Sequence, residues 1–358
     1  MADWMIYGAN GYTGQLVAEE AVKRGHKPLL AGRSESKLKP LAERLGLEYI
    51  AVPLDDAEAL ANAVSRVQLV YHAAGPFIHT SDPMLRACLA SGVHYLDITG
   101  EIPVYQNAFS YDEAAREKGI AILPGVGFDV IPSDCLIKYV ADQLPDATHL
   151  EVALDILSTS EGGGNASAGT TKAGLELIGS IGNLVRRDGK LTPIPFGSGG
   201  RKVRFASGER WTMPIPWGDL EMGYRTSGIP NITVSMTFPL PVIRAARLTS
   251  GLMRALLKVN PIRNGAGRLV DRMLSGPSEH ARETGRSYVY VQARNAKGDT
   301  REAWLETAEA YEFTAIAGVR AVERVLDGTY KGAMTPALAF GADFPLQIEG
   351  TRRWDTLP

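Results

Sequence analysis

The sequence predicts an α/β chain: an N-terminal, doubly wound parallel sheet followed by a second α+β domain on a mixed or antiparallel sheet. Three observations support this. Short apolar segments alternate with helical patterns up to residue 130. A glycine-rich turn joins the first apolar segment to the first helical pattern. Beyond residue 148, several strand-like segments follow one another, and the 358 residues suffice for two cores.

The first strand, residues 4–7, leads directly into a glycine turn and a helical pattern from Gln15 to Arg24. The turn consists of Gly8, Ala9, Asn10, Gly11, Tyr12, Thr13 and Gly14. Gly8 permits the tight turn, Gly11 lets the backbone approach a pyrophosphate, and Gly14 lets the helix pack near the strand. Phosphates then bind at the N–H groups of the helix start. This pattern is typical of a Rossmann dinucleotide-binding domain, although the spacing is G-x-x-G-x-x-G; the alternative is an ordinary glycine-rich turn.

The second strand, residues 28–31, indicates which dinucleotide binds. It ends in Gly32, Arg33 and Ser34, and Lys37 follows one turn later. NAD enzymes usually place a carboxylate here for the ribose hydroxyls. A carboxylate would repel a 2′-phosphate, whereas an arginine, a serine and a lysine would bind it, so the sequence favours NADP(H). The alternatives are that Arg33 is a solvated surface charge and that Glu35 reaches the ribose.

The later strands complete the predicted cofactor site. A strand at 48–52 precedes Leu54, Asp55 and Asp56, a polar turn expected beside the adenine. The strand at 68–74 ends in small residues that let the nicotinamide half lie against the backbone, and the loop comprises Ala73, Ala74, Gly75, Pro76 and Phe77. Further strands are expected at 93–98 and 120–123, with helices at 38–45, 57–64, 82–91 and 106–118.

Candidate proton-handling groups follow the last two of these strands, where the nicotinamide should end. They are Asp97 and Glu101 after the strand at 93–98, Asp129 and Asp134 after the strand at 120–123, and Tyr95. A carboxylate beside the dinucleotide could hold or move a proton if burial raises its pKa. The structural alternatives are a loop cap for Asp129, a hydrogen-bond anchor for Asp97 and a helix N-cap for Asp134. Tyr224 could donate a proton from the second domain.

Several blocks make the chain resemble the saccharopine dehydrogenase-like oxidoreductases, which include trans-acting enoyl reductases. The blocks are the glycine turn with residues 31–34, residues 73–77, 92–101, 125–134 and 224–231, and Thr335-Pro336-Ala337. The resemblance implies an NADP(H)-dependent reductase acting on a C=C or C=N bond of a small or acyl-type substrate. Open alternatives are a saccharopine-type amino-acid imine reductase and a non-catalytic, NADP-binding protein associated with lipid or membrane.

The pattern predicts a first domain at residues 1–130 and a second domain at residues 131–308, which is expected to carry the substrate and dimer contacts. Strands are expected at 149–157, 201–215 and 231–238, with a hairpin at 287–307 turning at 295–298. A glycine- and threonine-rich loop at 161–171 leads into a predicted helix at 172–185. A long helix then opens the segment 309–358, which the resemblance implies returns to the first domain.

Composition and charge narrow the class of protein. The net charge of −2 gives no general attraction to nucleic acid. Cys88 and Cys135 form no metal or redox spacing, which favours a reduced cytoplasmic compartment, and the six histidines are scattered and predict no metal site. The first strand begins at Trp4, so no signal peptide is expected, and no apolar stretch is long enough to span a membrane.

One basic segment has two possible roles. Residues 240–275 contain seven Lys or Arg and a single acid, Asp271. If 242–259 forms one helix, its basic residues share a face and its leucines share another, although Gly251 weakens a long helix. Such a helix either packs on its own protein or binds a membrane, an acyl chain or a carrier protein.

Overall fold

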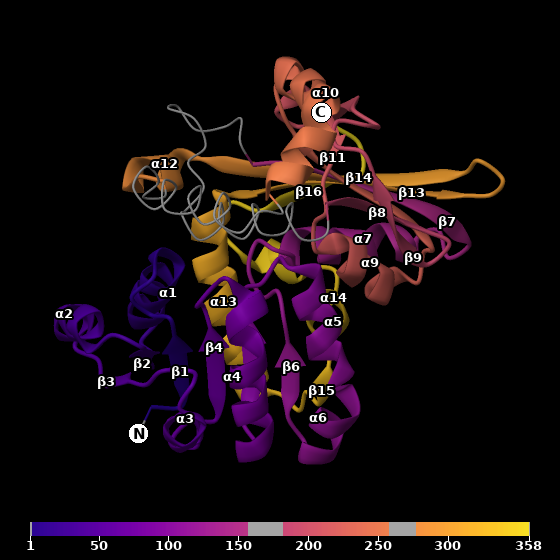
Figure 1. Ribbon diagram of the computed structural model, residues 1–358. Coiled ribbons are helices and arrows are strands. Elements are labelled where there is room, and N and C mark those ends of the chain that lie inside the picture. The colour runs from indigo at the N-terminus through magenta and orange to yellow at the C-terminus, as the bar shows by residue number, and fades with distance from the viewer. Residues whose placement is uncertain (1, 157–181, 258–276, 358) are drawn as a thin grey trace. The chain divides into compact units, whose positions relative to one another are not determined.

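The computed structural model describes residues 2–156, 182–257 and 277–357 (Figure 1). The chain forms two compact units. One contains Met1–Ile131 and Tyr311–Phe340, and the other contains Pro132–Ala310 and Gly341–Pro358. The segment 309–358, predicted to return as a whole, is therefore divided: its long helix belongs to the first unit, and its last residues pair in the sheet of the second.

The first unit is built on a parallel sheet, which confirms the predicted doubly wound class. Its described strands follow the spatial order β15-β6-β5-β4-β1-β2-β3. They are β1 (Trp4–Tyr7), β2 (Leu29–Gly32), β3 (Tyr49–Ala51), β4 (Leu69–His72), β5 (His94–Asp97), β6 (Ala121–Leu123) and β15 (Gly332–Ala333). Strand order reverses beside β1, and in such sheets ligands bind at the carboxyl ends of the strands next to this reversal.

Several helices of the first unit begin earlier than their sequence patterns indicate, whereas the helix predicted at 57–64 has those bounds. They are α1 (Tyr12–Lys23), α2 (Glu35–Leu45), α3 (Ala57–Val64), α4 (Phe77–Ser91), α5 (Ile102–Ser110), α6 (Asp112–Lys118), α13 (Ala310–Asp327) and α14 (Pro336–Phe340). The helix predicted at 106–118 is two helices meeting at Tyr111, whose hydroxyl donates to Asp82 Oδ1 at 2.9 Å. The helix predicted at 82–91 extends back to Phe77, with Pro83 inside it.

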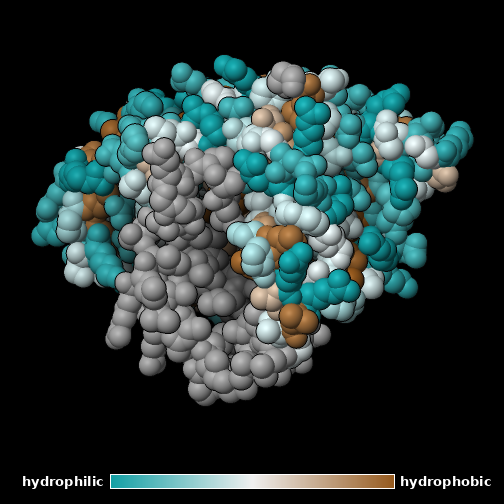
Figure 2. Space-filling model, turned by 90° about the horizontal axis from the view of Figure 1, so that it is seen from above, coloured by the Kyte–Doolittle hydropathy of each residue, from teal (hydrophilic) through white to brown (hydrophobic). Residues whose placement is uncertain are grey.

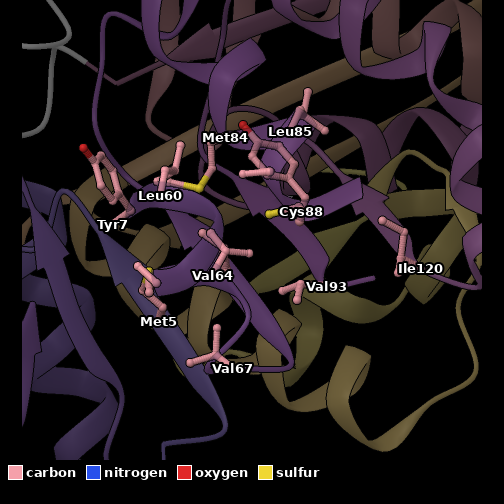
Figure 3. Packing of buried hydrophobic residues seen from close by; sticks show 14 of the residues in the cluster. Met5, Tyr7, Leu60, Val64, Val67, Met84, Leu85, Cys88, Val93 and Ile120 are labelled. Atoms are coloured by element: carbon pink, nitrogen blue, oxygen red, sulfur yellow. The ribbon is translucent and has the colours of Figure 1, made fainter. Parts of the chain in front are cut away.

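A contiguous apolar cluster covers one face of the parallel sheet (Figure 3). Met5 and Tyr7 of β1 meet Leu60 of α3 and Met84 and Cys88 of α4. Each large apolar side chain buried in this way stabilises the fold by about 1.5–3 kcal/mol relative to exposure. The strand ends are therefore held by a packed core, which gives the site at their carboxyl edge a rigid base.

The second unit contains a mixed sheet, as predicted. In the described residues its path runs β10-β11-β12-β7-β13-β14-β16, with β8 joined to β12 and β9. Its strands are β7 (Ala147–Asp155), β8 (Asn183–Arg187), β9 (Lys190–Ile194), β10 (Arg201–Phe205), β11 (Gly208–Pro214), β12 (Asn231–Thr237), β13 (Arg286–Asn295), β14 (Thr300–Ala308) and β16 (Arg352–Trp354). The β7–β12 pair is parallel and the other pairs are antiparallel.

Helices and turns of the second unit correct some of the predictions. The helices are α7 (Ile131–Asp142), α9 (Asp219–Ser227), α10 (Leu240–Leu257), α12 (Glu279–Thr284) and the 3-10 helix η1 (Phe344–Gln347). The predicted loop at 161–171 and most of the predicted helix at 172–185 lie outside the described residues. Residues 183–185 belong to β8, so a helix there is wrong. Asp188 and Gly189 both have positive φ and form the tight β8–β9 turn that sets this hairpin.

Candidate cofactor site

The glycine turn after β1 is built by close backbone contacts. Gly8 has a φ of +88°, and its N–H donates to the Ala31 carbonyl oxygen at 2.8 Å. A Cβ added at Gly8 would lie 2.8 Å from the backbone nitrogen of Ala74, and one at Gly14 would overlap the Gly8 carbonyl oxygen. Both positions therefore require glycine for the packing of β1, β4 and α1.

Gly11 differs from the other two glycines because space remains beside it. A Cβ there would meet a single atom within 4 Å, the Gly8 carbonyl oxygen at 3.2 Å. Gly11 is also the N-cap of α1, and no side chain caps this helix start. A cradle that a side chain would fill, at the positive end of a helix, fits a pyrophosphate.

The end of β2 places the predicted cationic residues beside this turn. A Cβ added at Gly32 would lie 3.2 Å from the Asn10 carboxamide oxygen, so the absence of a side chain lets the glycine turn reach β2. Arg33 and Lys37 are exposed, and neither forms an ion pair with any described residue. Ser34 is the N-cap of α2, but its side chain does not cap the helix. These groups fit the adenosine 2′-phosphate of NADP.

Glu35 faces another element. Its carboxylate accepts a hydrogen bond from the Tyr49 hydroxyl of β3 at 3.2 Å. This contact holds Glu35 on the β3 side of α2. The carboxylate that could have reached the ribose is thus engaged within the protein.

Tyr7 links the charges at this edge of the sheet. Its hydroxyl donates to the Val52 carbonyl oxygen at 2.9 Å. Burial raises the pKa of Tyr7 to about 12, with Arg33 lowering it and Asp55 raising it. Both charged side chains therefore act on the same hydroxyl, and the structure brings the β2 tip and the polar turn after β3 to one place.

The loop after β4 is fixed from two directions. The Ala73 N–H donates to the Tyr7 carbonyl oxygen at 2.7 Å, and the Thr80 hydroxyl donates to the Ala74 carbonyl oxygen at 2.5 Å. The buried Glu101 carboxylate accepts from the N–H groups of Phe77 and Ile78, each at 2.8 Å. Glu101, predicted as a proton-handling candidate, thus satisfies the start of α4 and positions the loop 73–77.

Two side chains of this loop region are buried rather than directed outward. The Phe77 ring lies edge-on to the His72 ring, with centroids 5.5 Å apart. His72 also stacks on Tyr7 at 5.5 Å, and its Nε2 contacts the Thr80 hydroxyl at 3.1 Å. Burial lowers the pKa of His72 to about 3, so the ring is neutral at physiological pH.

Asp97 is a fully buried hydrogen-bond anchor at the end of β5. Its carboxylate accepts from the Tyr95 hydroxyl at 2.7 Å and from the N–H groups of Thr99 at 3.0 Å and Gly125 at 2.9 Å. Burial raises its pKa to about 6, and the three hydrogen bonds oppose this shift. The side chain joins the end of β5 to the loop after β6, as the structural alternative expects.

Asp129 is half-buried beside the segment that follows β5. A Cβ added at Gly100 would lie 3.0 Å from Asp129 Oδ2, so this carboxylate depends on the missing side chain of Gly100. Both residues belong to the first unit. Asp129 is thereby placed near the carboxyl edge of β5 and β6, where the sequence predicted a proton-handling group.

The two remaining candidates have other partners in the second unit. Asp134 lies inside the first turn of α7, which begins at Ile131, so the N-cap prediction is wrong; its buried carboxylate accepts from the Thr226 hydroxyl at 2.5 Å. The ring of Tyr224 lies under the Arg186 guanidinium, 4.3 Å from its centroid. Arg186 is buried and donates to the Glu221 carboxylate at 2.5 Å.

Sequence reasoning missed Tyr7, His72 and the capping role of Glu101. Glu101 is separated by 24 residues from the N–H group of Phe77 that it binds, so no local pattern indicates the contact. His72 could have been found, since a polar residue inside an apolar strand needs a buried partner.

Comparisons with known proteins agree with this geometry. Residues 4–123 match the family described as the saccharopine dehydrogenase NADP binding domain. The resemblance to the saccharopine dehydrogenase-like oxidoreductases is confirmed. The match also confirms NADP(H) as the predicted cofactor.

Individual relatives extend the comparison. A saccharopine dehydrogenase-like oxidoreductase of Bos taurus is 29% identical over 54% of this chain and 50% of its own length. A trans-acting enoyl reductase of Mycobacterium bovis is 35% identical over 37% of this chain and 34% of its own. The matches thus span half or less of these two relatives. Both are oxidoreductases by name.

A solved structure shows a related fold across both units. The apo saccharopine dehydrogenase (L-Glu forming) from Saccharomyces cerevisiae superposes with a TM-score of 0.64, covering 99% of this chain and 100% of its own. The sequence identity is 10%, so the likeness concerns the fold alone.

Proposed function

We propose that this protein is an NADP(H)-dependent oxidoreductase that reduces a C=C or C=N bond of a small or acyl-type substrate. The observation that carries the proposal is the carboxyl edge of β1 and β2. There the open cradle at Gly11 lies beside Arg33 and Lys37, which are exposed and form no ion pair with any described residue, and the β2 tip itself is Gly32 rather than a carboxylate. This set of groups suits a phosphorylated dinucleotide and disfavours NAD.

Different parts of the edge hold different parts of the cofactor in this proposal. The start of α1 at Gly11 receives the pyrophosphate, and Arg33, Ser34 and Lys37 receive the 2′-phosphate. The loop 73–77, fixed by Glu101, supports the nicotinamide half. The bound cofactor supplies the hydride, so the protein has to orient the substrate and deliver one proton.

Asp129 is the preferred candidate for the proton step. It is half-buried beside Gly100 near the carboxyl ends of β5 and β6, where the nicotinamide is expected to end. Asp97 is fully buried and accepts three hydrogen bonds within the protein. Asp97 is better described as a positioning residue. Tyr224 stays a candidate donor from the second unit, with its ring supported by Arg186.

The substrate class draws on the relatives. The name of the Mycobacterium bovis relative favours an enoyl substrate, whose C=C bond accepts hydride when a carbonyl is conjugated to it. The alternative, an imine formed from an amino acid and a 2-oxo acid, carries several carboxylates and needs several buried cationic partners. A non-catalytic NADP-binding protein is the third possibility.

Substrate-dependent oxidation of NADPH tests the proposal. The panel contains unsaturated acyl thioesters of increasing chain length and mixtures of amino acids with 2-oxo acids. NADPH deuterated at the transferred position should yield a deuterated product by mass spectrometry. Turnover with acyl thioesters supports the proposal, turnover only with the amino-acid mixtures favours the imine reductase, and NADPH binding without turnover on either set favours the non-catalytic protein.

A variant pair tests the proton donor. Asp129→Asn should lower kcat while the dissociation constant for NADPH stays close to the wild-type value. Asp142→Asn is the matched control, because Asp142 is exposed and pairs with Lys138 on α7. If both variants turn over alike, Asp129 does not handle the proton.

A further inference from the structure

Helix α10 of the second unit presents apolar side chains to solvent. Leu248 is 87% exposed and Val242 is 46% exposed, while Ile243 is buried. Val242, Ala245 and Leu248 follow at three-residue steps, which places them in one row along the helix. Single exposed apolar residues are ordinary on protein surfaces, whereas a contiguous apolar row can mark an interaction site.

The opposite side of α10 is the one held by the protein. A Cβ added at Gly200 would lie 3.1 Å from Ile243 Cγ2, and one at Gly197 would lie 2.6 Å from the Arg247 backbone nitrogen. The loop between β9 and β10 therefore packs closely against α10 on its Ile243 side. Figure 1 shows α10 standing out from the strands of its own unit. The row of Val242, Ala245 and Leu248 faces solvent as a ridge along the helix.

Charge supplies the second observation. Residues 240–257 contain three arginines and no acidic residue. Arg244 is exposed beside the row, Arg247 is exposed one turn after Ile243, and neither forms an ion pair with a described residue. An apolar ridge flanked by unpaired arginines is complementary to a surface that offers acyl chains below a layer of phosphates.

From these contacts we infer that α10 lies on an anionic phospholipid bilayer, with Leu248 among the acyl chains and Arg244 and Arg247 at the phosphates. No described helix is long and apolar enough to cross a membrane. Seen from above, the described surface is mostly hydrophilic, with scattered hydrophobic residues (Figure 2).

Co-sedimentation with vesicles tests the inference directly. The full chain is mixed with vesicles of phosphatidylcholine alone or of phosphatidylcholine with phosphatidylserine. Wild type should bind the mixed vesicles more strongly. Leu248→Glu should lower the partition coefficient at least about tenfold, since it places a charge where the apolar side chain would enter the acyl chains. The double variant Arg244→Glu with Arg247→Glu should lose about tenfold or more on mixed vesicles and little on neutral ones.

Matched controls separate α10 from general surface effects. Leu338→Glu changes an exposed leucine of α14, which is 50% exposed. Arg294→Glu with Arg301→Glu reverses two exposed arginines of the β13–β14 hairpin. Both controls should bind vesicles like wild type, and circular dichroism should show every variant folded.

Three results would overturn the inference. Wild type could fail to bind mixed vesicles, Leu248→Glu could bind them as wild type does, or the controls could lose binding equally. A wild-type dimer that fails to bind vesicles and becomes a monomer with Leu248→Glu would instead assign the ridge to a second copy of the chain. None of these readouts depends on NADPH or on turnover.

Discussion

Replacing Arg33 by alanine should remove most of the preference for NADPH over NADH. Arg33 follows the last residue of β2, is exposed, and has no ion-pair partner among the described residues. Its guanidinium is therefore available to a 2′-phosphate without breaking an existing contact. Lys37, one turn into α2, is exposed in the same way, so a residual preference should survive the substitution.

The free energy that Arg33 contributes to NADPH binding depends on how exposed its contact with the phosphate is. A hydrogen bond to a charged group contributes about 1.5–3 kcal/mol, and solvent screening of an exposed pair reduces the net value toward about 1 kcal/mol. A bidentate arginine–phosphate contact lies between these limits. We therefore expect wild type to bind NADPH at least about tenfold more tightly than NADH, equivalent to about 1.4 kcal/mol. Arg33→Ala should remove most of this ratio and leave the smaller preference that Lys37 supports.

Titration calorimetry with both cofactors measures this ratio. Raising the ionic strength should weaken NADPH binding more than NADH binding, because salt screens the extra phosphate contact. Lys39→Ala is the matched control: Lys39 is an exposed cation on α2 with its Nζ 4.0 Å from Glu43. Equal wild-type affinities for the two cofactors, or an unchanged ratio in Arg33→Ala, would refute the reasoning.

Two further predictions concern the glycine turn and Asp97. Gly11→Val should abolish the rise in melting temperature on adding NADPH while the free protein stays folded. Gly14→Ala should instead destabilise the free protein by about 1–3 kcal/mol, since its Cβ meets the Gly8 carbonyl oxygen. If Gly11→Val still shows the rise in melting temperature with NADPH, the phosphates bind elsewhere. The raised pKa of Asp97, from 3.8 to about 6, means that the folded state holds this proton more tightly, so stability decreases as pH rises from about 4 to about 6, by roughly 3 kcal/mol. In urea unfolding, the stability of Asp97→Asn relative to wild type should therefore increase from about pH 4 to about pH 7. If the difference in free energy of unfolding between the two proteins is the same at both pH values, the predicted pH dependence is wrong.

The pattern of short apolar segments predicted the strands of the first unit because burial on both faces of a parallel sheet requires such segments. The hairpin of β13 and β14 was likewise predicted, since its turn at 295–298 and its flanking strands are local features. The Asp188-Gly189 turn could also have been predicted from the sequence, because this dipeptide favours the positive φ angles that both residues adopt. The helix predicted at 172–185 did not take this turn into account.

Residue types and their spacing alone determined the glycine turn, the cationic tip of β2 and hence the expected dinucleotide, because each depends on neighbours along the chain. Only the tertiary structure decided that Glu101 holds the start of α4, that Asp97 anchors the loop after β6, and that β16 pairs with β14. It likewise decided which side of α10 is covered, since Ile243 meets the loop at Gly200 while Leu248 meets solvent. These contacts join groups distant in sequence, and their formation depends on how packed elements meet rather than on the local pattern of either partner.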